Sequence, residues 1–322
     1  MTPDSKEQAY QYHYIDQEGR KQPFNKGWRF LRADVQLAQD PSFDDSNWSC
    51  INLPHDFSLA QPYTRNGEAE SAYKLGGVGW YRHYLVLDEE LAGCHVALTF
   101  EGSYMETEVY VNGQFIGKHL NGYQEFTHDI SDAVTFGAEN LLAVRVDNKV
   151  PSSRWYSGSG LYREVSLSVL PKVHFEDDQV NLSLIEPTDD INQGLAALAL
   201  QFDLSQLVSP ADYQVSLRLW EQTLGSQNRQ LVYQQAEQSL QDLAEVEPYG
   251  TTITLPRVNL WSPDQPHLYD LELTLWHQGQ TCDVFYRETG FRQIVFDANQ
   301  GLLVNGKATK IKGSVFLMTK VG

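Results

Sequence analysis

The chain has 322 residues, enough for about two domains, and its 41% of hydrophobic residues is typical of a globular protein with a core. A formal net charge of −18 without any cluster of Lys and Arg argues against nucleic acid as a partner, because phosphates require concentrated positive charge. An acidic surface is repelled by anionic membranes, and no run approaches the roughly 18 apolar residues that a membrane span needs.

Alternating apolar residues dominate the first half of the chain, as half-buried strands require. Such strands are expected at residues 95–100, 108–111, 141–146 and 164–169. Asn112-Gly113 favours a tight hairpin, because both residues tolerate positive φ. We therefore expect a β-sandwich over residues 1–171.

A second block of strands follows the junction at Pro171-Lys172, and strands are expected at residues 180–184, 198–204, 213–220, 251–255 and 268–276. Their number and spacing fit an immunoglobulin-like sandwich over residues 172–290. The Gln-rich stretch 222–241 is expected to form an exposed hairpin. A third element, residues 291–322, contains the hairpin signal Asn305-Gly306.

The cysteines and the N-terminus indicate a cytoplasmic protein. Cys50, Cys94 and Cys282 are widely spaced and suggest no disulfide framework, and residues 1–22 contain no apolar core of a secretory signal. No group of His, Asp and Glu has metal-ligand spacing, and no glycine loop for phosphate occurs. We expect neither a metal nor a cofactor.

Six segments in order resemble motifs of glycoside hydrolase family 2, the family of β-galactosidases, β-glucuronidases and β-mannosidases. They are LPHDF at 53–57, GVGWYR at 77–82, VYVNG with GYQEF at 109–113 and 122–126, Asn148 with RWYSGSGLYR at 154–163, WSPDQPHLY at 261–269, and GFR with LVNGK at 290–292 and 303–307. The resemblance is greatest to the β-galactosidase and β-glucuronidase branch. It implies an all-β chain made of a jelly-roll sandwich and an immunoglobulin-like sandwich, followed in the family by a (β/α)₈ barrel that carries two catalytic glutamates.

We expect residues 291–322 to be only the truncated start of that barrel domain, so that the chain lacks the barrel and is inactive alone. Retaining glycoside hydrolysis needs two carboxyl groups about 5–5.5 Å apart, and a barrel takes roughly 250 residues. Only residues 314–322 follow Gly313. Glu106 and Glu108 are interpreted as exposed acidic residues on a solvated strand face. No catalytic residue is therefore assigned in this chain.

The last residues suggest how the barrel was lost. Family members continue after the lysine-glycine segment with a histidine motif that lines the sugar site, whereas this chain reads SVFLMTKVG. Reading the codons of Leu317 to Val321 one base out of frame permits His-Asp-Gln-Gly, with only the Asp forced. We hypothesise a frameshift near codon 315, and a fragment cut at an arbitrary boundary is the alternative.

By resemblance, the loop that approaches the sugar runs from Asn148 to Tyr156. Arg154 would donate paired hydrogen bonds to hydroxyl groups, and Trp155 or Tyr156 would stack on a pyranose face. The structural alternative carries equal weight for Arg154 and Trp155.

Neighbouring motif residues are interpreted as structural. Tyr162 and Arg163 are expected to hold strand ends together, and Asp56 is expected to stabilise a turn. The tryptophans Trp28, Trp48, Trp80 and Trp261 are expected in the core.

Two other functions remain open: a stand-alone carbohydrate-binding module, and a structural subunit that docks a separately encoded barrel. If the chain is instead the front part of a glycosidase, it binds a β-glycoside only in the context of the complete enzyme. Surfaces that pack on the barrel in complete family members would be exposed in this chain. We therefore expect self-association or docking to a barrel domain.

Overall fold

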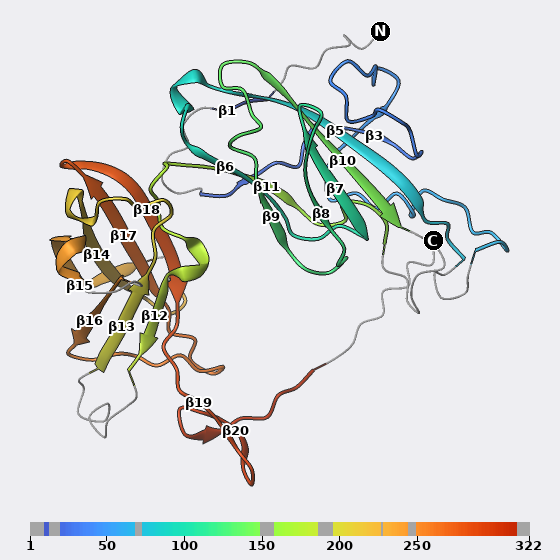
Figure 1. Cartoon of the computed structure of the whole chain (residues 1–322). Coiled ribbons are helices and arrows are strands. Elements are labelled where there is room, and N and C mark those ends of the chain that lie inside the picture. The colour runs from blue at the N-terminus through green and yellow to red at the C-terminus, as the bar shows by residue number, and fades with distance from the viewer. Residues whose placement is uncertain are drawn as a thin grey trace. The chain divides into compact units, whose positions relative to one another are not determined.

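The computed structural model describes residues 10–12, 20–67, 73–148, 158–185, 196–226, 228–243 and 249–313 (Figure 1). The chain divides into two compact units, Met1–Lys172 and Val173–Gly322. Strands are the main secondary structure of both units, and the only α-helix among these residues is the single turn α1 (Leu240–Leu243). Three short 3₁₀ segments are η2 (Glu89–Leu91), η3 (Asp177–Gln179) and η5 (Pro210–Asp212).

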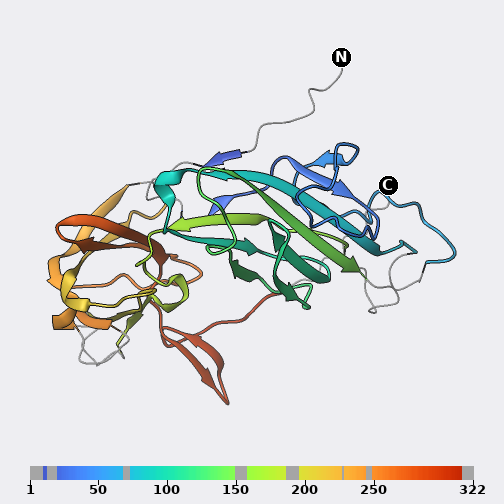
Figure 2. The same ribbon diagram turned by 45° about the horizontal axis from the view of Figure 1, so that its top comes forward.

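The first unit is a sandwich of two sheets. One sheet has seven strands in the order β4-β3-β5-β10-β7-β8, with β1 added in parallel beside β5, and the other has the order β2-β11-β6-β9. Figures 1 and 2 show β5, β10 and β7 running side by side. The strands are β1 (Tyr10–Tyr12), β2 (Gln22–Pro23), β3 (Trp28–Leu31), β4 (Ser49–Ile51), β5 (Gly77–Leu87), β6 (His95–Phe100), β7 (Glu106–Val111), β8 (Gln114–His119), β9 (Phe126–Asp129), β10 (Glu139–Asn148) and β11 (Val165–Leu170).

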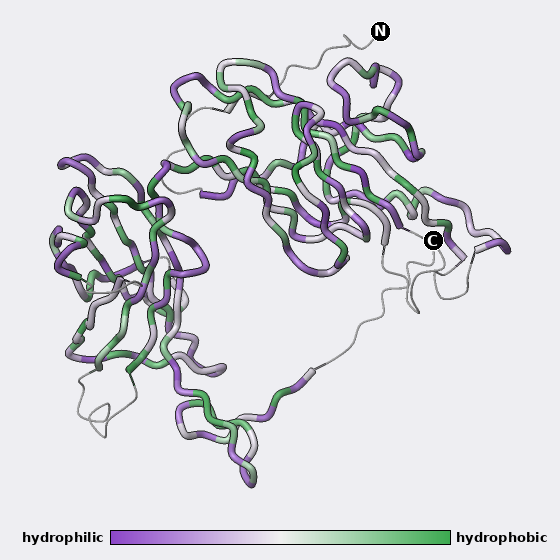
Figure 3. Tube along the Cα trace, in the orientation of Figure 1, coloured by the Kyte–Doolittle hydropathy of each residue, from purple (hydrophilic) through white to green (hydrophobic). Residues whose placement is uncertain are grey.

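Alternation along the central strands creates the core of this sandwich. The even-numbered Leu142, Val144 and Val146 of β10 face inward, where they join residues of the opposite sheet such as Leu98 and Leu167. The odd-numbered residues of β10 face outward, as a period of two requires. Figure 3 shows hydrophobic residues along these strands. Burial of this apolar surface is the main contribution to folding.

The outward face of the seven-stranded sheet is partly covered by the excursion at residues 32–48. Its Ala38 and Trp48 pack on Trp80 and Ala143 as a second, smaller apolar cluster. Beside this cluster the guanidinium of Arg82 is fully buried. It donates from Nε to Asp45 Oδ2 at 2.7 Å, and further to the Tyr84 hydroxyl and to backbone carbonyls of the excursion. A buried charge requires this degree of pairing.

The second unit is a smaller sandwich of a three-stranded and a four-stranded sheet, ordered β12-β13-β16 and β15-β14-β17-β18. Its core contains Leu198, Leu217, Leu271 and Leu273, all essentially inaccessible. A separate small sheet, β19-β20-β21, follows. The strands are β12 (Asn181–Leu184), β13 (Ala196–Phe202), β14 (Tyr213–Gln222), β15 (Arg229–Ser239), β16 (Tyr249–Leu255), β17 (Tyr269–His277), β18 (Gln280–Thr289), β19 (Ile294–Asp297), β20 (Gly301–Val304) and β21 (Lys307–Ala308).

The expected fold class is confirmed: the chain is all-β, with a jelly-roll sandwich followed by an immunoglobulin-like sandwich, and the described residues contain no (β/α)₈ barrel. The Asn112-Gly113 and Asn305-Gly306 turns both form hairpins, with φ of 51° and 82° in the first. The Gln-rich stretch belongs to the β14–β15 hairpin, as expected. That residues 291–322 begin a barrel domain stays a prediction. No helix among the described residues is long and apolar enough to cross a membrane.

Candidate functional site

Several of the motif segments singled out from the sequence meet at one end of the first sandwich, and Asp56 joins two of them. Its Oδ1 accepts the backbone N–H groups of Ser58 and Ser159, each at 2.9 Å, and the Ser58 hydroxyl. The backbones are also paired, because Phe57 N–H donates to the Ser159 carbonyl at 2.9 Å. A carboxylate that accepts several N–H groups makes strong, charge-assisted hydrogen bonds.

Asn148, the last residue of β10, holds the other side of this junction. Its Nδ2 donates to Ser159 Oγ at 2.7 Å and to the Gly158 carbonyl at 3.2 Å. Asn148 is only 7% exposed, and its Oδ1 has no hydrogen-bond partner among the residues that the structure describes. We call Asp56, Asn148, Gly158 and Ser159 the clamp. It brings together Asn148 and Gly158, which flank residues 149–157 in the chain.

Tyr81 of β5 supports the clamp from inside the sandwich. Its hydroxyl accepts the Leu161 N–H at 3.3 Å and lies 3.0 Å from His55 Nδ1. Burial raises the pKa of the Tyr81 phenol far above its usual value. Burial likewise lowers the pKa of His55, while the Asp56 carboxylate acts in the opposite direction. A Cβ on Gly160, which has φ +106°, would lie 2.1 Å from the Tyr81 hydroxyl.

Tyr162 and Arg163 fasten a neighbouring loop, so the structural role expected for them is confirmed. The Tyr162 hydroxyl donates to the Gly122 carbonyl at 2.6 Å. Arg163 Nη1 lies 3.3 Å from the carbonyls of both Tyr123 and Glu101. Burial raises the pKa of Tyr162, which keeps its hydroxyl protonated as a donor.

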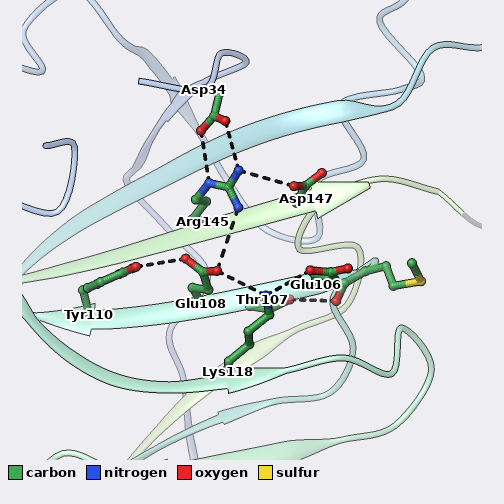
Figure 4. A network of polar contacts seen from close by, with 9 residues as sticks. Asp34, Glu106, Thr107, Glu108, Tyr110, Lys118, Arg145 and Asp147 are labelled. Carbon is green, nitrogen blue, oxygen red and sulfur yellow. Dashed lines mark hydrogen bonds and ion pairs between the residues drawn. The ribbon is translucent and has the colours of Figure 1, made fainter. Parts of the chain in front are cut away.

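An ion-pair network occupies the outward face of the seven-stranded sheet (Figure 4). Lys118 Nζ binds Glu106 at 2.9 Å and Glu108 at 3.3 Å, and Arg145 is paired with Asp34 through two hydrogen bonds of 3.1 Å and with Asp147 at 3.3 Å. The interpretation of Glu106 and Glu108 as exposed residues on a solvated strand face is therefore wrong. Their side chains are only 22% and 21% exposed, because the neighbouring strand β8 supplies Lys118.

The structure places one of the four sugar-binding candidates, Asn148, at the base of the predicted loop. Arg154, Trp155 and Tyr156 lie outside the described residues, so their assignment as substrate-binding stays a prediction. Sequence reasoning assigned Asp56 to a local turn, which is confirmed by its bond to Ser58, but missed its bond to Ser159. Within the described part of the chain no group of three or more His, Cys, Asp or Glu side chains could hold a metal ion.

Comparison with known protein families accounts for both sandwiches. The model of "Glycosyl hydrolases family 2, sugar binding domain" matches residues 25–171, and that of "Glycosyl hydrolases family 2" matches residues 184–292. The clamp and the ion-pair network both lie in the first of these segments.

Curated relatives match most of this chain but extend far beyond it. Beta-galactosidase BoGH2A of Bacteroides ovatus is 31% identical over 293 residues, which cover 90% of this chain and 34% of the relative. A putative beta-glucuronidase of Formosa agariphila is 29% identical over 293 residues, 90% of this chain and 27% of that protein. The chain thus spans about a third of the length of these relatives.

Solved structures show the same partial coverage. A glycosyl hydrolase family 2 member from Bacteroides cellulosilyticus aligns with a TM-score of 0.78 and 33% identity, over 91% of this chain and 38% of that one. Beta-glucuronidase 2 of Bacteroides uniformis, covalently bound to cyclophellitol-6-carboxylate aziridine, aligns with a TM-score of 0.70 and 27% identity, over 91% and 35%.

Proposed function

Because the chain belongs to glycosyl hydrolase family 2, we propose that it is the N-terminal, non-catalytic portion of a retaining β-galactosidase- or β-glucuronidase-type enzyme. The observation that carries the proposal is coverage: both sandwiches match, yet 90% of this chain corresponds to only 34% of Beta-galactosidase BoGH2A. The complete enzyme would hydrolyse O-glycosyl bonds in carbohydrate metabolism.

In this proposal the chain contributes one wall of the sugar site, and the carboxyl pair comes from elsewhere. Glycoside hydrolysis with retention needs two carboxyl groups about 5–5.5 Å apart, one as nucleophile and one as acid and base. Glu106 and Glu108 are unsuited to such roles, since one lysine bridges them. The clamp would instead fix both ends of the segment that carries Arg154, Trp155 and Tyr156, so that these residues meet a sugar at little cost in entropy.

Hydrolysis by the purified chain tests the proposal directly. We expect no release of nitrophenol from nitrophenyl β-galactoside or β-glucuronide, with a full-length family member as the positive control. Hydrolysis that co-purifies with the chain through two further columns would contradict it. Sequencing the DNA beyond codon 313 then distinguishes an interrupted gene, which would encode a barrel in another frame, from a fragment with a clean stop.

A second candidate is a stand-alone carbohydrate-binding module, which the "sugar binding domain" description of residues 25–171 favours. It predicts that the isolated chain binds a saccharide. A third is a subunit that docks a separately encoded barrel, which predicts that a barrel-containing chain co-purifies with it.

A further inference from the structure

Asparagine is followed by glycine at four places in the chain: Asn66-Gly67, Asn112-Gly113, Asn121-Gly122 and Asn305-Gly306. Asparagine is a thermolabile residue, and a following glycine has no Cβ to keep its backbone nitrogen away from the asparagine side chain. All four pairs lie in the described part of the chain. Their surroundings therefore decide which of them is free to react.

Two of the pairs form the tips of hairpins, and their amides are held by hydrogen bonds at both ends. Asn112 Nδ2 donates to the Ala133 carbonyl at 2.9 Å and to Asn140 Oδ1 at 2.8 Å. Its Oδ1 accepts the Leu141 N–H at 2.9 Å. The amide of Asn305 likewise binds two backbone groups of other segments, at 3.0 and 2.9 Å. Neither amide can turn toward the following glycine unless these bonds break.

The Asn121-Gly122 pair is restrained mainly through its glycine. Asn121 Oδ1 accepts the Tyr123 N–H at 2.9 Å, and the Gly122 carbonyl accepts the Tyr162 hydroxyl at 2.6 Å. Gly122 is also buried, and a Cβ on it would overlap the ring of Tyr104. A reaction between the Asn121 amide and the next nitrogen would therefore have to break two bonds.

Asn66 is exposed, and its amide makes no hydrogen bond with any residue that the structure describes. The following nitrogen is restrained by one bond, because Gly67 N–H donates to the Thr64 carbonyl at 3.0 Å. An intramolecular attack needs the two reacting atoms to approach within about 3–3.5 Å. At this position the approach of the Gly67 nitrogen to Asn66 Cγ costs one hydrogen bond only.

We propose that Asn66 is a site of spontaneous modification, at which the chain deamidates through a cyclic imide with water as the second reactant. The Gly67 nitrogen gives its proton to a base in solution and forms a bond to Asn66 Cγ. The Cγ–Nδ2 bond breaks, and the amide group takes a proton from water and leaves as ammonia. Water then opens the imide at either carbonyl, which gives aspartate or isoaspartate and adds one negative charge. The reaction involves neither a saccharide nor a barrel, so this inference goes beyond the proposed function and does not depend on it.

Peptide mapping by mass spectrometry tests the site, with the chain incubated in mildly alkaline buffer, folded or unfolded in urea. Trypsin places the four pairs in different peptides, because a Lys or Arg lies between each pair and the next. Each hydrogen bond that must break slows the reaction about five-fold. We therefore expect folding to slow Asn66 by about five-fold, Asn121 and Asn305 by about thirty-fold, and Asn112 by about a hundred-fold or more.

Ion exchange gives a second measurement on the folded chain. The acidic form that accumulates should have the charge of Asn66→Asp and should be absent from Asn66→Gln. It should still appear in Asn299→Gln, which changes an exposed asparagine that no glycine follows. A digest of the unincubated chain corrects for reaction during digestion. If Asn66 in the folded chain reacts no faster than Asn112 and Asn305, or if the acidic form persists in Asn66→Gln, Asn66 is not the site.

Discussion

Asp56 Oδ1 accepts the backbone N–H of Ser159 at 2.9 Å, a hydrogen bond between residues 103 positions apart. Through it, a turn between β4 and β5 is tied to the segment that precedes β11. The same oxygen accepts the N–H of Ser58, so one carboxylate fixes a local turn and a distant loop together.

Replacing Asp56 by alanine should destabilise the first sandwich by about 2 kcal/mol, because hydrogen bonds to a charged acceptor contribute about 1.5–3 kcal/mol. Hydrogen exchange of the β10 amides would measure the change. Asp44→Ala is the matched control, since Asp44 binds the N–H of Ser46 at 3.0 Å and the Ser46 side chain within its own turn, without the bond to a distant loop, and it should cost less than half as much. Equal losses in the two variants would show that the link to Ser159 is unimportant.

Gly160→Ala should destabilise the same unit by about 3 kcal/mol. A Cβ at this position lies 2.1 Å from the Tyr81 hydroxyl and 3.0 Å from the Phe57 ring, and φ is +106°. Gly93→Ala separates the two causes, because Gly93 has φ +90° but nothing within 4 Å of its Cβ position. It should cost only about 1 kcal/mol, the conformational part. Thermal unfolding of the three proteins gives the comparison, and identical melting temperatures would refute the steric argument.

The first sandwich should lose stability in acid because of His83. Burial lowers the pKa of His83 to about 4, while Nε2 lies 2.8 Å from the Lys26 carbonyl and is placed to donate to it. The unfolded chain takes up this proton near the ordinary pKa of 6.5, whereas the folded chain does so only near 4, so stability present at pH 7 falls through this window. The expected loss by pH 5 is about 2 kcal/mol.

His83→Gln is the control for this titration, because an amide donor keeps the bond to the Lys26 carbonyl and has no charge to gain. Its unfolding free energy, measured by hydrogen exchange at pH 7 and pH 5, should fall by about 2 kcal/mol less than that of the unmodified chain. The same fall in both proteins would assign the acid sensitivity to other groups, such as His55 and His128, whose pKa values burial also lowers.

The isolated chain should self-associate through β19. Phe296 is 81% exposed, and Ile294 and Val295 beside it are also exposed, so both faces of this short strand present apolar side chains. Phe296→Ser should lower the weight-average mass in light scattering at high concentration. Val208→Ser, at an exposed valine outside the strands, should not. A monomeric unmodified chain at high concentration would contradict the expectation.

The strands that were predictable from the sequence are those with one long buried face. β7 alternates clearly, with every second residue buried, because one of its faces packs on the core, whereas β4 (Ser49–Ile51) is short, largely exposed and without alternation. Alternation of apolar and polar residues indicates that one face of a strand contacts the core. β4 lies at the end of its sheet, where little core contact exists.

The candidate site was predictable only where its interactions are local. The turn made by Asp56 follows from an Asp two residues before the N–H that it accepts. Its bond to Ser159, and the pairing of Lys118 with Glu106 and Glu108, depend on which strands and loops lie together. No spacing along the chain encodes that arrangement.

The excursion at residues 32–48 has a consequence for protein engineering. It covers Trp80 with Ala38 and Trp48, and its Asp45 pairs with the buried Arg82, so part of the broad face of the large sheet is closed by the chain itself. A library for altered recognition that randomises Asp45 on that face would leave the buried Arg82 without its ion-pair partner in most of its members. Randomising exposed loop positions such as Tyr63 and Tyr73, with Asp45 and Arg82 left unchanged, would preserve a foldable scaffold.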